Sequence, residues 1–113
     1  MKLTILTASL AIAAIAGVAE AQDASRSDMR CVVAFSRLLQ TPAYKDAAGA
    51  GMFYYIGRLD GREPGLDLAA AMRREIANMA TADYTTEAQR CGAELKARNE
   101  AVKAAGEAVK AGR

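Results

Sequence analysis

Residues 48–65 have the sequence AGAGMFYYIGRLDGREPG, and the way this stretch folds decides the architecture of the chain. Three interpretations compete: a glycine-rich ligand loop, a β-hairpin, and a helix that packs closely against another helix. A dinucleotide-binding loop requires the pattern Gly-x-Gly-x-x-Gly after a strand, but Tyr54 stands three residues after Gly51. The sequence therefore argues against the ligand loop.

The hairpin interpretation rests on the aromatic run 53–56 and on the turn dipeptide Asp60-Gly61. A hairpin also needs a second strand. Pro64 removes a ladder donor where that strand would begin, and Gly65 follows it directly. The hairpin is therefore the weaker of the two remaining interpretations.

A helix over about 42–60 gives the same stretch a continuous apolar face. Thr41 precedes Pro42, which suits the first helical position because its missing N–H does no harm there. Gly61 is expected to take the left-handed conformation beyond the helix end. Glycines inside a helix cost up to about 1 kcal/mol each relative to alanine. Close approach of another helix would offset that cost, and we expect Gly57 to make this contact. The shared face contains Ala48, Met52, Tyr55, Ile56 and Leu59.

Three further helices are expected from capping patterns. Residues 25–28 read Ser-Arg-Ser-Asp, a capping box that predicts a helix over about 26–40. Asp67 is a suitable cap for a helix over about 68–80. Thr86 and Gln89 form another box, so the last helix is expected to begin near 84–87. The sequence thus predicts an all-α fold, a compact bundle of about four helices.

Each of these helices carries apolar residues at helical spacing. The first stripe contains Cys31, Val32, Phe35, Leu38 and Leu39, and we expect Arg26, Arg30 and Arg37 opposite it to form a solvated face. The stripe of 68–80 contains Ala69, Met72, Ile76 and Met79, which are expected to be core rather than copper ligands. The last stripe contains Tyr84, Ala88, Cys91, Leu95, Arg98, Val102, Ala105 and Val109.

The last stripe runs into a short repeat, AVKAAGE at 101–107 followed by AVKA at 108–111. Such a seam could pair with a second chain, but a coiled coil requires sustained heptads. We therefore expect a monomer rather than a homodimer, with a C-terminal helix end that frays.

Cys31 and Cys91 are the two cysteines of the chain, and each falls on an apolar stripe. A redox pair usually has Cys-x-x-Cys spacing, and two cysteines without any histidine lack the ligands of a zinc site. The sequence therefore predicts a structural disulfide that staples the first helix to the last.

The N-terminus resembles a secretory leader in its physical pattern. Lys2 precedes an apolar run from Leu3 to Val18, and Ala19-Glu20-Ala21 fits the small-x-small cleavage pattern. The run is shorter than the roughly 20 residues that cross a bilayer. We expect a signal peptide at 1–21, a single domain at 22–113 with no membrane span after cleavage, and a periplasmic or secreted location.

The composition excludes several kinds of chemistry. The chain has no histidine, so imidazole acid–base catalysis and a Ser-His-Asp triad are absent. Its formal charge is only +2, which does not indicate nucleic-acid binding. Carboxylates such as Asp60, Glu63 and Glu75 are expected to be surface charges with local ion pairs. We expect no enzyme, no catalytic residue, no cofactor and no metal site.

The run 51–61, with Cys31 upstream and Arg90-Cys91 downstream, resembles small exported helical proteins from alphaproteobacteria. The resemblance covers roughly residues 28–95, and it implies a helical fold and an envelope location without assigning a catalytic residue. In architecture alone, the chain is also similar to the periplasmic acid-stress chaperones of the HdeA type, which are short, exported, helical and bridged by one disulfide.

Two functions of different classes follow. The first is an exported binding or adaptor module that docks on an unidentified envelope protein through the exposed part of residues 54–62. Its candidate contact residues are Tyr54, Arg58, Asp60 and Arg62. The alternative is an acid- or stress-responsive chaperone-like protein that exposes its apolar helix faces when acid loosens the bundle.

Overall fold

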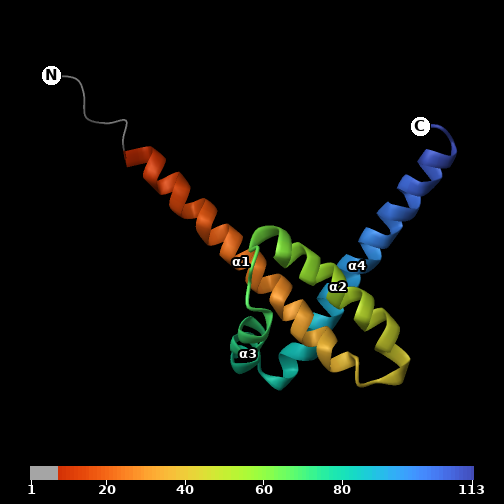
Figure 1. Cartoon of the computed structure of the whole chain (residues 1–113), viewed down its shortest axis with the longest axis horizontal. Helices are drawn as coiled ribbons and strands as arrows, with labels where there is room; N and C mark the ends of the chain where they lie inside the picture. The colour runs from red at the N-terminus through yellow and green to blue at the C-terminus, as the bar shows by residue number, and fades with distance from the viewer. Residues whose placement is uncertain (1–7) are drawn as a thin grey trace.

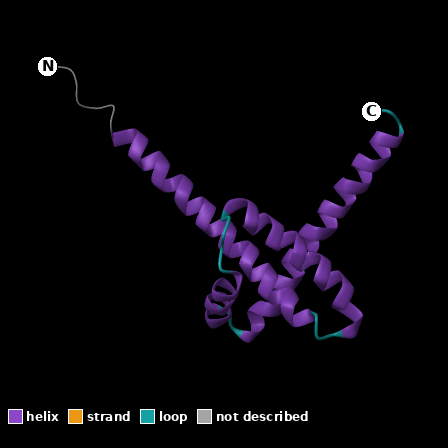
Figure 2. Cartoon of the chain, in the orientation of Figure 1, coloured by secondary structure: helices purple, strands orange, loops and turns teal. Residues whose placement is uncertain are grey.

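The computed structural model describes residues 8–113, which form helices joined by short loops (Figure 2). The helices are α1 (Ala8–Leu38), the short 3-10 helix η1 (Pro42–Tyr44), α2 (Lys45–Arg62), α3 (Leu68–Asn78) and α4 (Thr81–Lys110). Within 8–113 there is no strand. The predicted all-α fold is therefore confirmed. The aromatic run 53–56 lies in the middle of α2, so the hairpin interpretation is wrong.

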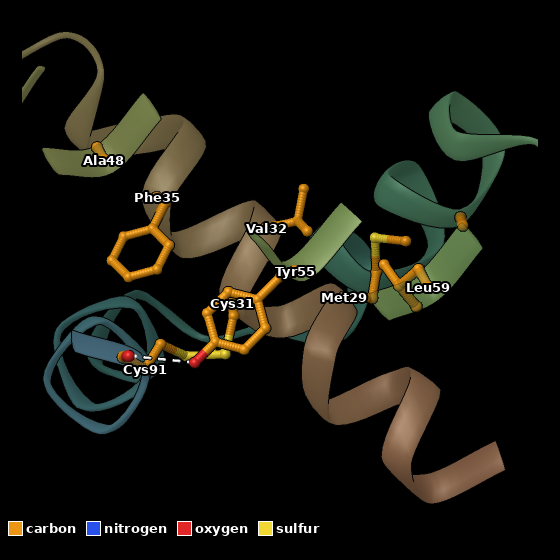
Figure 3. Close-up of a cluster of buried hydrophobic side chains, with 9 residues drawn as sticks. Met29, Cys31, Val32, Phe35, Ala48, Tyr55, Leu59 and Cys91 are labelled. Atoms are coloured by element: carbon orange, nitrogen blue, oxygen red, sulfur yellow. Dashed lines mark hydrogen bonds between the residues drawn. A yellow bond between two sulfur atoms is a disulfide. The ribbon is translucent and has the colours of Figure 1, made fainter. Parts of the chain in front are cut away.

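Helix α1 is the centre of the bundle, and each of the other α-helices packs against it (Figure 1). Helix α2 returns along α1 in the opposite direction, α3 lies beside α1, and α4 crosses it. The buried apolar residues come from all four α-helices, and Figure 3 shows most of them. The core cluster consists of Met29, Cys31, Val32, Phe35, Ala48, Tyr55, Leu59, Ala71 and Cys91, and Val33 and Ala34 are buried as well.

The expected stripes of the first two long helices are confirmed, because their members lie in this cluster or pack against it. The stripe expected for residues 68–80 is correct only in part, because Met72 packs against the cluster but Ala69 and Ile76 are exposed. Helix α3 buries Ala71 and Glu75, whereas Ile76 is 46% exposed. A glutamate can replace an apolar residue at this position because arginines of α1 neutralise it.

Two expected helix starts are also wrong. Helix α1 runs unbroken through residues 25–28, because the alanine-rich residues before them are strong helix formers. Asp28 therefore does not cap a helix start. Its side chain is buried and forms ion pairs with Arg58 and Arg62. Helix α4 begins at Thr81, where the Ala80 N–H donates to the Asp83 carboxylate over 2.8 Å. Asp83 therefore provides the cap that Thr86 and Gln89 were expected to supply.

The ends of α2 and the start of α3 agree only in part with the expectations. Pro42 begins η1 as expected, but the Thr41 side chain makes no capping hydrogen bond. Gly61 lies inside α2, and Gly65 is the glycine with a left-handed φ of 81°. The chain needs this conformation just after Pro64, where α2 has ended and the chain turns towards α3. Asp67 caps α3 as expected, accepting from the Ala70 N–H over 3.0 Å.

The close approach between α1 and α2 occurs at Gly51 and not at Gly57, so that expectation is wrong. A Cβ atom at residue 51 would lie 2.7 Å from the Phe35 ring and 2.9 Å from the Leu95 side chain. A Cβ at residue 57 would have no atom within 4 Å, because Gly57 is on the solvent side of α2. Gly51 is thus the position where α2 approaches Phe35 of α1 and Leu95 of α4.

Two helix ends extend beyond the bundle, the first part of α1 and the last part of α4 (Figure 1). Residues 1–7 of the expected signal peptide lie outside the described residues, and the rest of it forms the start of α1. The expected cleavage site before Gln22 falls within this helix, ahead of Ser25, which is buried. The core cluster, from Met29 to Cys91, therefore lies after that site.

Candidate functional site

The disulfide joins α1 to α4 in the middle of the bundle (Figure 3). Cys31 and Cys91 are both fully buried, and their Cα atoms are 5.7 Å apart. This confirms the pairing that the sequence predicts. The closed loop has a sequence separation of 60, which corresponds to roughly 4 kcal/mol of stabilisation in the chain-entropy model. The staple therefore fixes the position of α4 on the bundle.

Tyr55 of α2 lies against this disulfide. Its hydroxyl is 3.1 Å from the Cys91 backbone carbonyl oxygen and 3.1 Å from a carboxylate oxygen of Glu94. Burial raises the pKa of the Tyr55 phenol well above its ordinary value, and the negative charge of Glu94 raises it further. Tyr55 thus remains a neutral hydrogen-bond donor that ties α2 to α4.

Asp28 of α1 is almost completely buried and is neutralised by two arginines of α2. Arg58 Nε lies 3.2 Å from Asp28 Oδ2, and Arg62 Nη1 lies 2.5 Å from the same oxygen. Arg58 also pairs with Glu94 of α4. Burial disfavours the charge of Arg58, but hydrogen bonds to Tyr54 and Glu94 and the charge of Asp28 outweigh it and raise its pKa. This cluster connects α1, α2 and α4.

A second charged cluster connects α1 to α3 and α4. Arg30 Nε lies 3.3 Å from Glu75 Oε1, and the same guanidinium reaches Asp83 and Glu87 of α4. Arg26 also lies 3.5 Å from Glu75. Further along, the Arg37 guanidinium lies 3.8 Å from the centre of the Tyr84 ring. Arg26 and Arg37 are exposed, as expected of a solvated face, whereas Arg30 is only partly exposed, and all three arginines also contact neighbouring helices.

Three of the four candidate contact residues on α2 take part in these internal clusters. Arg58 and Arg62 pair with Asp28, and Tyr54 packs edge-to-face on Tyr55 with its hydroxyl accepting from Arg58. Asp60 alone among the four is fully on the surface. The structure thus brings three of them together as bundle contacts and leaves Asp60 facing solvent. That they contact a partner stays a prediction.

A separate surface on α2 carries a large exposed aromatic side chain. Five exposed residues recur at helical spacing along the side of α2 that faces away from α1, and we call them the α2 outer face. Phe53, at its centre, is 79% exposed. Neither aspartate of this face forms an ion pair within residues 8–113. The five residues are Asp46, Ala50, Phe53, Gly57 and Asp60.

The aromatic run 53–56 does not by itself distinguish Phe53 from the residues that follow it, so the sequence analysis does not include Phe53 among the contact residues. The spacing contains a signal that could have found it. Asp46, Phe53 and Asp60 follow one another at intervals of seven residues, so all three lie on one face of the helix. The two aspartates favour solvent, which indicates that this face is exposed. A phenylalanine on that face has to be exposed.

A second surface feature is a cleft of about 1140 Å³ that runs along α4, between this helix and the end of α1 with the start of α2. We call it the α4 cleft. Its walls include apolar groups from all three helices and several basic side chains, among them Arg37, Lys96 and Arg98, none of which pairs with a carboxylate within residues 8–113. Its apolar lining includes Phe35, Leu38, Ala47, Leu95 and Val102.

Within the described residues, no three histidine, cysteine or acidic side chains lie close enough to hold a metal ion. None of the helices in residues 8–113 combines the length and the apolar character needed to cross a bilayer.

Comparisons with protein-family models, with curated proteins and with solved structures find no match to this chain. The resemblances noted from the sequence therefore stay predictions.

Proposed function

We propose that this protein is an exported, non-enzymatic binding module that docks on a protein of the cell envelope through the α2 outer face. The single observation that carries the proposal is the exposure of Phe53, 79% of whose surface faces solvent at the centre of that face. The apolar run and Ala-x-Ala-like pattern at the N-terminus support export. The buried disulfide supports folding in an oxidising compartment.

Phe53 has the surroundings of a docking anchor rather than of a stray surface residue. Its neighbours on the face one turn away are Ala50 and Gly57, which leave the ring standing clear on both sides. Aromatic side chains placed in a partner's pocket contribute a large share of interface energy, because they bury much surface at a small entropy cost. The ring can therefore enter a pocket without obstruction from its own helix.

Charge complementarity indicates the kind of partner. Asp46 and Asp60 lie fourteen residues apart, so they bracket Phe53 at the two ends of a stripe about 21 Å long. Both carboxylates are exposed and available to cations. The matching surface is a groove with a central apolar pocket and basic side chains near both ends, the helix-in-groove mode of recognition.

The internal clusters would keep this face rigid. Arg58 and Arg62 attach the inner side of α2 to Asp28, and Tyr55 attaches it to α4 beside the disulfide. A pre-organised helix loses less conformational entropy on docking than a mobile one. In this account, three of the candidate residues on α2 position the face, and Asp60 contacts the partner.

The experiment compares variants of the oxidised chain in capture of partners from envelope extract of the native host. A specific partner is one whose capture by the wild-type chain is prevented by an excess of the untagged wild-type chain. Phe53→Ala should abolish capture of that partner. The double variant Asp46→Asn/Asp60→Asn should capture less of it, and its capture should depend less on salt concentration. Ile76→Ala removes an exposed apolar side chain from α3 and is the matched control. Equal capture by the Phe53→Ala and wild-type chains would contradict the proposal.

A second candidate, an acid-responsive chaperone-like protein, is favoured by the two buried carboxylates. Asp28 faces Arg58 and Arg62, and Glu75 faces Arg26 and Arg30. Loss of the negative charge on both carboxylates would remove the acidic partner of Arg26 and of Arg62 and one of the partners of Arg30 and of Arg58, and would loosen α2 and α3 from α1. Suppression of client aggregation that appears only in acid, and that is unaffected by Phe53→Ala, would favour this function over docking.

A further inference from the structure

The α4 cleft reaches down to the hydrophobic centre of the bundle. Three of its lining residues, Ala34, Phe35 and Ala48, are themselves buried. On the opposite wall, Ala88 and Gly92 of α4 carry a single methyl group or no side chain. A Cβ at Gly92 would meet no atom within 4 Å, so this part of the wall borders open space. The hollow exists because the small residues on both walls leave it unfilled.

The cleft has room for one long and narrow molecule. Its volume of about 1140 Å³ is slightly above the usual range of small-molecule sites, which is about 300–1,000 Å³. Its α4 wall includes Tyr84 and Arg98, which are about 21 Å apart along the helix axis. An acyl tail spans half of a bilayer core that is about 30 Å thick. A long-chain fatty acid therefore fits along this wall with its head group at one end.

The lining of the cleft carries an excess of positive charge. Within residues 8–113, Glu100 is the one acidic side chain in the lining, and Lys103 already pairs with that carboxylate over 3.5 Å. Arg37, Lys96 and Arg98 also line the cleft, and none of them pairs with a carboxylate in the described part of the chain. Charge complementarity therefore favours an anionic occupant over a neutral or cationic one.

Two of these cations identify the end of the cleft where the anion lies. Arg37 is stacked on the Tyr84 ring, 3.8 Å from its centre. At the other end, Lys96 and Arg98 lie on the two edges of the α4 wall, because residues two apart on a helix do not face each other. An ammonium and a guanidinium on opposite edges can both donate hydrogen bonds to one carboxylate held between them.

We infer that the α4 cleft binds a long-chain fatty acid in its carboxylate form. The carboxylate lies between Lys96 and Arg98. The acyl tail runs over the Phe35 ring towards Tyr84. Each methylene group buried against these apolar walls favours binding, so the affinity rises with the length of the tail. The site does not rest on the proposed docking function, because Phe53 does not line the cleft.

The test is the binding of palmitate to the oxidised chain, measured by backbone NMR at concentrations below those at which palmitate aggregates. The chemical-shift changes should saturate and should concentrate on residues 34–38 and 84–98, which include much of the lining. Myristate, whose tail is two methylene groups shorter, should bind about tenfold more weakly. Hexadecyltrimethylammonium has a similar tail on a cationic head group and should not shift these residues.

One substitution fills the cleft without disturbing the core. Gly92→Leu should abolish palmitate binding, because the new side chain enters the open space beside α4. Its melting temperature should not fall, since leucine is a better helix former than glycine. Gly106→Leu makes the same change on α4 outside the cleft, also into open space, and should bind palmitate as the wild-type chain does.

A second pair of variants tests the contacts to the head group. Lys96→Gln/Arg98→Gln should bind palmitate about tenfold more weakly, because it removes both charged donors. Lys110→Gln/Arg113→Gln removes the same charge from the end of the chain outside the cleft, and its affinity for palmitate should equal that of the wild-type chain.

Failure of the wild-type chain to bind palmitate would overturn the inference, as would equal affinities of the Gly92→Leu and wild-type chains. Binding to anionic phospholipid vesicles without binding of free palmitate would assign the basic edge of the cleft to a membrane surface instead. Phe53→Ala should bind palmitate as the wild-type chain does, so failure of the proposed docking function would leave this result unaffected.

Discussion

The Tyr55 hydroxyl of α2 lies 3.1 Å from the backbone carbonyl oxygen of Cys91, the residue that the disulfide joins to Cys31 of α1. One buried point thus connects three helices, through a covalent bond and a hydrogen bond that do not depend on each other. Bundle stability and the rigidity of the α2 outer face both depend on this point.

Reduction of the disulfide should destabilise the bundle strongly. The expected loss is roughly 4 kcal/mol, which is a large part of the stability of a small domain. The melting temperature should fall by about 15 °C or more. Calorimetry with and without reductant, with Cys31→Ala/Cys91→Ala as the permanent equivalent, measures the effect. A melting temperature that does not respond to reduction would show that the staple contributes little.

Tyr55→Phe should lower stability by about 1 kcal/mol through loss of its hydrogen bonds. The pKa of Tyr55 is raised in the folded state above its unfolded value of about 10, so the protonated phenol favours the fold. That contribution is complete below about pH 10 and is lost as the pH rises towards the folded-state pKa. Stability of the wild-type chain should therefore fall more steeply above about pH 10 than that of Tyr55→Phe. Urea midpoints across this range test the difference, and parallel slopes would contradict it.

The two glycines of α2 should respond to alanine in opposite directions. Gly51→Ala should cost about 1–3 kcal/mol, because the added methyl overlaps the Phe35 ring and the Leu95 side chain. Gly57→Ala should stabilise the protein by up to about 1 kcal/mol, because its Cβ meets open solvent and alanine is the better helix former. Chemical denaturation of both variants measures the change in the free energy of unfolding. Similar changes for Gly51→Ala and Gly57→Ala would show that the close helix approach is not at Gly51.

Asp28→Asn should destabilise the protein by about 1–3 kcal/mol, since it leaves Arg58 and Arg62 without their shared counter-charge. Asp60→Asn is the matched control on the exposed side of α2 and should change stability by less than about 0.5 kcal/mol. If Asp28→Asn proves as mild as the control, the cluster does not hold α2 on α1.

Much of the fold could be predicted because strong local signals coincide with the tertiary contacts. Cys31 and Cys91 each fall on an apolar stripe, so helical periodicity alone places them on faces that meet in the core. Ala48, Tyr55 and Leu59 share one helix face for the same reason. Asp67 caps α3 through a bond to a residue three positions away, which sequence spacing reports directly.

The expectations failed where a long-range contact overrides a local pattern. Asp28 matches a capping box, but two arginines of another helix hold it in the core. Glu75 is charged, yet it lies on the buried side of α3 because Arg30 reaches it. Gly51 and Gly57 have similar sequence surroundings, and only the packing of Phe35 distinguishes them. The α2 outer face could not be predicted in the same way, because the sequence does not show directly which side of this helix the bundle covers.

The most direct test of the proposed docking function is site-specific photo-crosslinking in intact cells of the native host. Two variants are compared: in the first, a photoreactive phenylalanine analogue replaces Phe53, and in the second, it replaces Ile76 of α3. We expect a single adduct with an envelope protein from position 53, with a lower yield when Asp46 and Asp60 are replaced by asparagine. Position 76 should give no such adduct. Absence of an adduct at position 53, or the same adduct from both positions, would contradict docking through the α2 outer face.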